Sequence, residues 1–253
     1  MKNIRIIPRL DIKGPNVVKP VNTEALRVVG KPQEMAQRYY QDGADELLYL
    51  DIVASLYQRS IDFDLLKSVV ENIFIPVTVG GGIRSVQDID NILRCGADKV
   101  AINTYAVHNP QFLKEAVERF GSQCIVLFVE VKHQSNGFNE VYTDGGREHT
   151  GKDALEWIKE ALALGVGEIL LTSIDRDGTR KGYDLDFIKQ VNAVAQVPVV
   201  VHGGAGSFES LEAAVTQGHA DALAISSILH YKETTIRDIK KYLAAHHINV
   251  RLD

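Results

Sequence analysis

Two acidic residues stand where long apolar runs end, at matching places in the two halves of the chain. Asp11 lies at the end of the run that begins at Arg5, and Glu130 at the end of the run that begins at Cys124. If both runs are strands of one parallel barrel, the carboxylates face each other at its mouth. Carboxylates that share an apolar-walled cavity can hold different protonation states and act as acid and base. A solvated charge at a strand end is the plain alternative for each.

Glycine loops are also duplicated. The stretch "IPVTVGGGIR" in the first half is matched by "VPVVVHGGAGS" in the second. Glycine lets backbone N–H groups approach an anion closely, and a following helix N-terminus adds positive partial charge. A tight turn that needs positive φ explains one glycine pair, but the duplication favours a paired function. A loop with amide or hydroxyl side chains follows each glycine loop, so we predict two phosphate sites, formed with Asn103 and Thr104 and with Ser226 and Ser227.

These residues must be positioned by a repeating α/β fold. Short apolar runs alternate with amphipathic segments, the pattern of parallel βα units. The predicted strands are Arg5–Asp11, Glu46–Asp51, Pro76–Gly80, Lys99–Asn103, Cys124–Glu130, Glu168–Ser173, Pro198–His202 and Ala222–Ser226. Several helical segments between them open with Ser, Asn or Pro and close on Gly. Eight such units in 253 residues predict a (β/α)₈ TIM barrel. A doubly wound sheet is the alternative.

An internal repeat supports the barrel. "ELLYLDI" at 46 pairs with "EILLTSI" at 168, and "GADKVAIN" at 96 pairs with "GHADALAIS" at 218. We therefore expect one domain, 1–253, built of two half-barrels, approximately 1–121 and 122–253. The longest interruptions, 14–31 and 133–150, follow the first and fifth strands at equivalent places.

Composition restricts the class of protein. The chain is 45% apolar and 24% charged with a net charge of −5, and it has no basic run, which argues against general nucleic-acid binding. No window has the length of a membrane span, and the first residues lack a signal-peptide pattern, so a cytoplasmic location is expected. Cys95 and Cys124 have no metal-ligand spacing and are expected to be reduced thiols. We expect no metal and no cofactor.

The chain resembles the cyclase subunit of imidazole glycerol phosphate synthase (HisF), a histidine-pathway enzyme with the same half-barrel repeat. The similar motifs run from "RIIPRLDIK" through "VGGGIRS" and the specific "LLTSIDRDGT" to "INVRLD". The resemblance implies a bisphosphorylated ribulosyl-aminoimidazole substrate, with Asp11 and Glu130 as the catalytic pair for ammonia attack, cleavage and ring closure. It places the substrate at Lys19, Gly82, Asn103, Thr104, Asp177, Gly178, Gly204, Ser226 and Ser227.

At the other end of the barrel, four charged residues of alternating sign stand at or next to the starts of strands. The resemblance implies that Arg5, Glu46, Lys99 and Glu168 form a salt-bridged ring where ammonia enters from a docked glutaminase, a class I glutamine amidotransferase chain, and that Asp98 lies on the docking face. In an ordinary barrel, residues at this end support stability.

The chain departs from the family pattern at its active face. Glu130 replaces the usual Asp, and His202 replaces a common Ser. Further departures lie in the loop after the first strand, at Gly14, Pro15, Thr23, Val28 and Lys31. They leave open a paralogue that pairs with a glutaminase to amidate a surface-polysaccharide sugar. A silent scaffold that activates its glutaminase, and the related isomerase of the same pathway, are weaker alternatives.

Overall fold

A closed barrel of eight parallel strands forms the centre of the computed structural model, which describes residues 2–21 and 24–252; Thr23 lies outside the described residues. The barrel strands are β1 (Arg5–Lys13), β4 (Leu47–Asp51), β5 (Val77–Gly80), β6 (Lys99–Ile102), β7 (Ile125–His133), β10 (Glu168–Ser173), β11 (Val199–His202) and β12 (Ala222–Ile225). They pair in this order, and β12 pairs with β1 to close the ring. The predicted barrel is confirmed.

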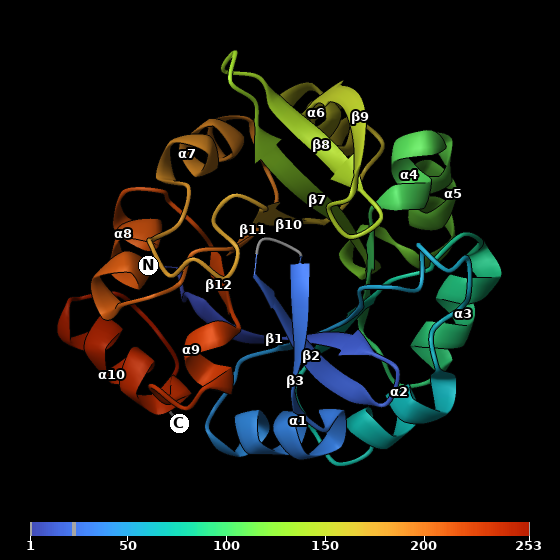
Figure 1. Ribbon diagram of the computed structural model, residues 1–253. Helices are drawn as coiled ribbons and strands as arrows, with labels where there is room; N and C mark the ends of the chain where they lie inside the picture. Colours follow the sequence, from blue (N-terminus) through green and yellow to red (C-terminus); the bar gives the residue numbers. More distant parts are fainter. Residues whose placement is uncertain (1, 22–23, 253) are drawn as a thin grey trace.

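Helices surround the strands on all sides (Figure 1). The helices that follow the strands are α1 (Pro32–Gln41), α2 (Phe63–Val70), α3 (Val86–Arg94), α5 (Gln111–Phe120), α6 (Ala154–Ala163), α7 (Leu185–Val194), α8 (Phe208–Thr216) and α10 (Ile236–Ala245). Several begin at a side-chain cap, as Ser85 does for α3 and Asp153 for α6. Short segments α4 (Thr104–His108), η1 (Ser122–Cys124) and α9 (Ser227–His230) lie between them.

The two long interruptions contain strands that the sequence reasoning did not predict. After β1, strands β2 (Asn16–Val21) and β3 (Glu24–Gly30) form an antiparallel ribbon, and β8 (Asn139–Thr143) and β9 (Glu148–Asp153) extend β7 in the same way. In Figure 1 both ribbons lie on the side of the barrel that faces the viewer. They continue β1 and β7, the strands that carry Asp11 and Glu130, so the mouth has walls beside both carboxylates.

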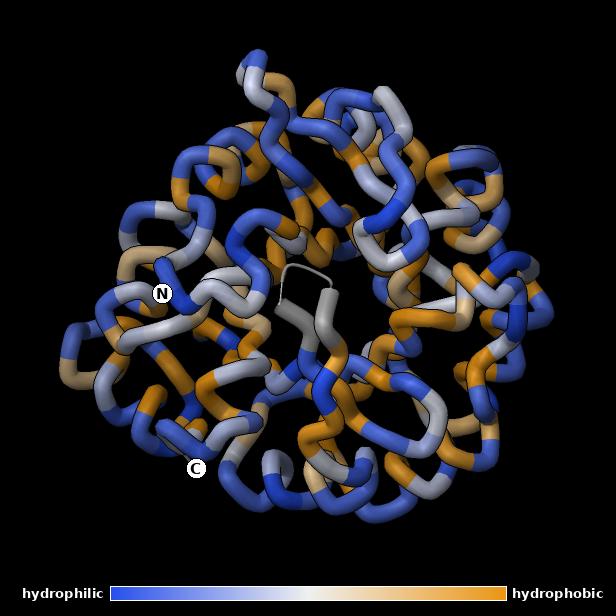
Figure 2. Tube along the Cα trace, in the orientation of Figure 1, coloured by the Kyte–Doolittle hydropathy of each residue, from blue (hydrophilic) through white to orange (hydrophobic). Residues whose placement is uncertain are grey.

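Alternation along the strands divides the buried side chains into two sets. One set packs between strands and helices and contains most of the apolar residues, among them Trp157, Phe187 and Leu66. The other fills the barrel interior with Ile7, Leu48, Leu50, Ala101, Val126, Leu170, Val200, Ala222 and Ala224. Figure 2 shows the hydrophobic positions concentrated in the central strands and on the helix faces turned toward them.

Side chains along a strand point alternately to its two faces, so residues two positions apart point to the same face. The polar residues that point into the interior can therefore be identified from the apolar ones. Two residues before Leu48, Ala101 and Leu170 lie Glu46, Lys99 and Glu168, at the lower end of the barrel; two residues after Leu170 and Val200 lie Thr172 and His202, at the mouth. An apolar layer therefore separates two polar layers.

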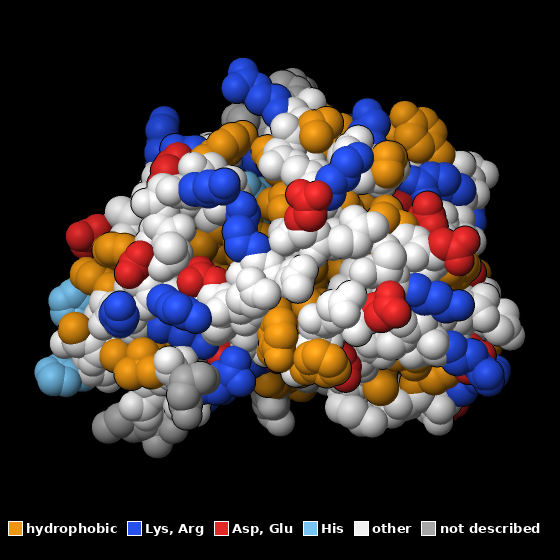
Figure 3. Space-filling view, turned by 90° about the horizontal axis from the view of Figure 1, so that it is seen from below, with side chains coloured by type: hydrophobic (Ala, Val, Ile, Leu, Met, Phe, Trp, Pro, Cys, Tyr) orange, Lys and Arg blue, Asp and Glu red, His pale blue; other side chains and the backbone are white. Residues whose placement is uncertain are grey.

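One face of the outer surface is mixed in charge. Figure 3, in which the molecule of Figure 1 is seen from below, shows Lys and Arg side chains interspersed with Asp and Glu, with small groups of apolar side chains between them. Among the described residues, no helix is both long and apolar enough to cross a membrane. Nor do three or more His, Cys, Asp or Glu side chains in that part of the chain form a cluster suited to a metal ion.

Candidate active site

Two cavities open at the mouth of the barrel, and each is lined by one of the predicted glycine loops. The larger, about 310 Å³, is lined by Gly81 and Gly82 together with Asn103, Thr104 and Glu130. The smaller, about 10 Å³, is lined by Lys19, Asp177, Gly178, Gly203, Gly204, Ser226 and Ser227. The structure thus brings together every residue that the sequence analysis assigned to each phosphate site.

The glycines are required by the backbone. Gly82 and Gly204 have φ of +66° and +105°, a region that L side chains rarely adopt. A Cβ on Gly82 would lie 2.4 Å from the carbonyl oxygen of Arg59, and one on Gly204 would lie 2.1 Å from that of Gly182. Both loops therefore press against neighbouring backbone and leave a side-chain-free surface at the cavity.

The loops after β6 and β12 are similarly alike. Asn103 has φ −122° and ψ −91°, and Ser226 has φ −124° and ψ −77°; each is followed by a short helix whose first turn receives no side-chain cap.

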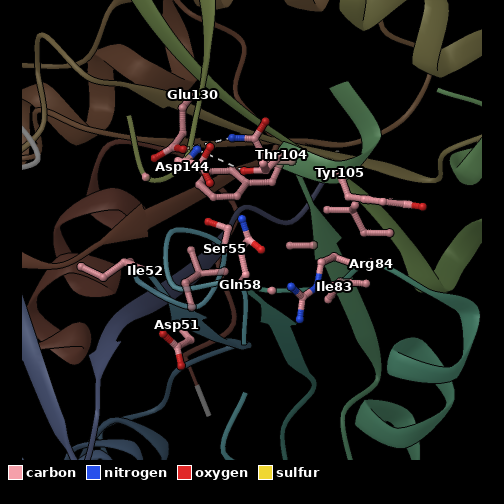
Figure 4. Close-up of a pocket in the computed structure, with 18 of the residues that line it drawn as sticks. Asp51, Ile52, Ser55, Gln58, Ile83, Arg84, Thr104, Tyr105, Glu130 and Asp144 are labelled. Carbon is pink, nitrogen blue, oxygen red and sulfur yellow. Dashed lines mark hydrogen bonds between the residues drawn. The ribbon is translucent and has the colours of Figure 1, made fainter. Parts of the chain in front are cut away.

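The two cavities differ in the charged side chains that line them. Asp51, Asp144 and Arg84 all line the larger cavity (Figure 4). Asp51 is also paired with Arg59 at 2.8 Å.

Asp11 is completely buried at the mouth. Its Oδ1 accepts a hydrogen bond from Nε of Arg9 at 2.7 Å, and Nζ of Lys19 lies 3.9 Å from its Oδ2. The charge of Arg9 offsets the cost of burying this carboxylate. Oδ2 has no hydrogen-bond partner within the described residues.

Glu130 is buried in the wall of the larger cavity, where Figure 4 places it beside Thr104 and Asp144. Its Oε2 accepts from the side-chain amide of Asn103 at 3.0 Å. Burial away from water raises the pKa of Glu130 to about 7, although Arg9 and the Asn103 hydrogen bond act in the opposite direction. Near neutral pH this carboxyl group therefore both gives and takes a proton, as a general acid or base must.

Lys19 lies on β2 and reaches into the smaller cavity. Its ammonium group donates to Oδ1 of Asp177 at 2.7 Å, and both side chains are buried. The β2–β3 ribbon therefore contributes a cation to the cavity of the second glycine loop. Substrate contact by Lys19 stays a prediction.

Sequence reasoning missed Arg9, which connects most of these groups. Its side chain is buried, donates to Asp11, to Thr172 at 2.9 Å and to His202 at 2.9 Å, and lies over the ring of Phe128. The sequence did contain a signal for this residue. Arg9 stands in an apolar strand two positions before Asp11, so its side chain must point to the same face of the strand as that of Asp11, into the barrel.

The four charges at the opposite end of the barrel form a closed ring. Arg5 donates to both Glu46 and Glu168, and Lys99 donates to the same two carboxylates at 3.1 and 2.8 Å. Exposed Asp98 lies next to this ring and accepts from the backbone N–H of Val77 at 2.8 Å. The predicted arrangement of the ring is thus observed.

Fold and site define a (β/α)₈-barrel protein with two buried carboxyl groups, Asp11 and Glu130, at the mouth. Residues 5–235 match the family model described as histidine biosynthesis protein. The chain is 57% identical over 209 residues to the imidazole glycerol phosphate synthase subunit HisF of Legionella pneumophila, which covers 83% of this chain and 99% of that protein. The chain belongs to the HisF family, and the resemblance found in the sequence is confirmed.

Proposed function

We propose that this protein is the cyclase subunit of imidazole glycerol phosphate synthase. In that role it uses ammonia to convert a bisphosphorylated phosphoribulosyl-formimino aminoimidazole carboxamide nucleotide into imidazole glycerol phosphate and the aminoimidazole carboxamide ribonucleotide. The observation that carries the proposal is the high identity to a HisF subunit over most of the chain. This comparison favours the cyclase over the sugar-amidation paralogue.

The geometry supports the chemistry. A substrate with a phosphate at each end would span the two glycine-lined cavities, with its reacting centre between Asp11 and Glu130. Asp11, whose Oδ2 has no hydrogen-bond partner within the described residues, is suited to take a proton from the attacking ammonia. Glu130, with its pKa near 7, is suited to protonate the leaving nitrogen and to recover the proton as the ring closes.

The acidic residues that line the larger cavity restrict which groups there could hold a phosphate. Because Asp51 and Asp144 also line it, a phosphate there must be held by the backbone N–H groups of the glycine loop and by Arg84. In the smaller cavity the positive charge would come from Lys19, which is paired with Asp177 of the same cavity. The two phosphate groups are thus held by different means.

A subunit implies a partner, and we infer that the partner is a glutaminase that docks at the end of the barrel opposite the mouth. The ring of Arg5, Glu46, Lys99 and Glu168 would form the ammonia entrance. Ammonia would then cross the apolar barrel interior, whose side chains offer no competing hydrogen bonds. We propose that the protein works in the cytoplasm.

Ammonia-dependent consumption of the nucleotide tests the proposal. Wild type should turn over, and Asp11→Asn should lose at least a hundredfold in rate, since an amide cannot exchange the proton. Glu130→Asp should also be slower, because the shorter side chain holds its carboxyl about 1.5 Å further from its target. Asp186→Asn, at an exposed position of α7, is the matched control. A fully active Asp11→Asn would contradict the carboxylate-pair mechanism.

A further inference from the structure

His202 lies at the end of β11 between Arg9 and the second glycine loop. It is 4% exposed, and both ring nitrogens have polar neighbours. Nδ1 lies 2.9 Å from Nη1 of Arg9, and Nε2 lies 3.3 Å from Oγ of Ser226 and 3.8 Å from Oδ1 of Asp177.

Arg9 determines which ring nitrogen of His202 carries the proton. A guanidinium group has only donors, so the 2.9 Å contact requires a lone pair on Nδ1 of His202. An imidazolium ion has no lone pair on either nitrogen and is therefore excluded. The remaining form is the neutral ring with its proton on Nε2.

The partners on the other side of the ring agree with this tautomer. The hydroxyl of Ser226 donates to the carbonyl oxygen of Arg9 at 3.2 Å, which leaves its lone pairs free to accept from Nε2–H. The bonds form a cycle from the Arg9 side chain through His202 and Ser226 back to the Arg9 backbone. Each donor in it meets an acceptor.

The charges around His202 also favour the neutral ring. Arg9 on β1, Lys19 on β2 and His230 on α9 face it, and Asp177 after β10 is paired with Lys19. Burial and the positive charges of Arg9 and Lys19 keep the pKa of His202 well below its usual range.

We propose that Arg9 is a positioning residue that fixes His202 in the Nε2–H tautomer, and that this N–H is a donor of the second glycine-loop cavity for a phosphate group of the substrate. The proposal rests on the proposed function in taking this cavity as a phosphate site. His202, Ser226, Gly204 and Lys19 all line it. A phosphate that enters can replace Ser226 as the acceptor of Nε2–H without a change in the protonation of His202.

The tautomer is measured by the ¹⁵N shifts of the imidazole nitrogens, with the His202 signals assigned by their loss in His202→Asn. Wild type should show the Nε2–H form from pH 6 to pH 8. In Arg9→Met the Nδ1 shift should move and the ring should begin to titrate, whereas Arg119→Met, at an exposed position of α5, should leave both unchanged. An Nδ1–H tautomer or an imidazolium ion in wild type would overturn the proposal.

Phosphate binding tests the donor without changing Arg9. His202→Asn keeps an acceptor near the position of Nδ1 but loses the Nε2–H donor, and His202→Gln keeps a donor near the position of Nε2. Inorganic phosphate is titrated while the backbone amide signals of Gly204 and Ser226 are followed. His202→Asn should bind about tenfold more weakly than wild type, as for one hydrogen bond to a charged group, and His202→Gln within about twofold.

Equal affinity of wild type and His202→Asn, or no phosphate-dependent shift of these amides in wild type, would refute the donor role. Neither readout depends on turnover. If the nucleotide is not consumed while the tautomer and the phosphate affinities are as expected, the proposed function fails and the role of Arg9 and His202 stands.

Discussion

Replacing Glu130 with Gln tests the most perturbed carboxyl group of the site. Burial raises its pKa to about 7 from an ordinary 4.5, so the folded protein holds a proton that the unfolded chain releases. The stabilisation from this group is fully present below about pH 4.5 and is lost as pH rises through about 7. Glutamine has the same shape, stays neutral and has no such pH dependence.

The size of the effect follows from the shift. One pKa unit corresponds to about 1.4 kcal/mol, and integration between pH 5 and pH 8 gives about 2.5 kcal/mol for this group. Relative to wild type, the free energy of unfolding of Glu130→Gln should therefore rise by about 2 to 3 kcal/mol between pH 5 and pH 8. Other titrating groups cancel in the difference.

Urea unfolding of wild type and variant at both pH values measures this difference. Glu115→Gln, at an exposed position of α5, is the matched control and should differ from wild type equally at pH 5 and pH 8. If Glu130→Gln behaves like the control, Glu130 is already ionised at pH 5, and its assignment as the acid of the reaction is wrong.

Three further predictions concern the ring and the loops. Lys99→Ala should lower glutamine-dependent turnover with the partner subunit and leave ammonia-dependent turnover unchanged, because Arg5 still binds the carboxylates of Glu46 and Glu168. Lys114→Ala is the control, and an equal loss of both activities would show that Lys99 stabilises the fold instead. Crystals soaked in phosphate should show one ion at each glycine loop, and density at neither would contradict a bisphosphate substrate. Gly204→Ala should destabilise the fold by about 1 to 3 kcal/mol in thermal unfolding and weaken phosphate binding, whereas Gly137→Ala, with open space around it, should cost less and bind normally.

The barrel could be predicted from sequence because each buried parallel strand is a short apolar run bounded by turn residues. The predicted limits differ from those of β4, β5, β6, β11 and β12 by a single residue, and β10 agrees at both ends. The ribbons after β1 and β7 were missed because their strands are polar or mix polar with apolar residues, and antiparallel pairing with a neighbour rather than a continuous apolar run stabilises them. The division into half-barrels at about residue 121 stays a prediction.

The site could be predicted as far as its residues lie at strand ends. Asp11, Glu130 and the paired glycine loops are visible in sequence because the carboxyl ends of parallel strands meet at one face. The network around Arg9 was not visible, since it depends on which side chains cross the barrel to meet. The raised pKa of Glu130 likewise depends on burial and on neighbours from β1 and from the loop after β6, which no spacing reveals.

The fate of the ammonia nitrogen tests the central claim most directly. The protein is incubated with the bisphosphorylated nucleotide and ¹⁵N-labelled ammonium, and the products are separated and examined by NMR. The proposed function predicts that the label appears in the imidazole ring of imidazole glycerol phosphate, at a rate that Asp11→Asn lowers at least a hundredfold. Unchanged nucleotide with no labelled imidazole, under conditions in which the protein is folded and binds phosphate, would contradict it.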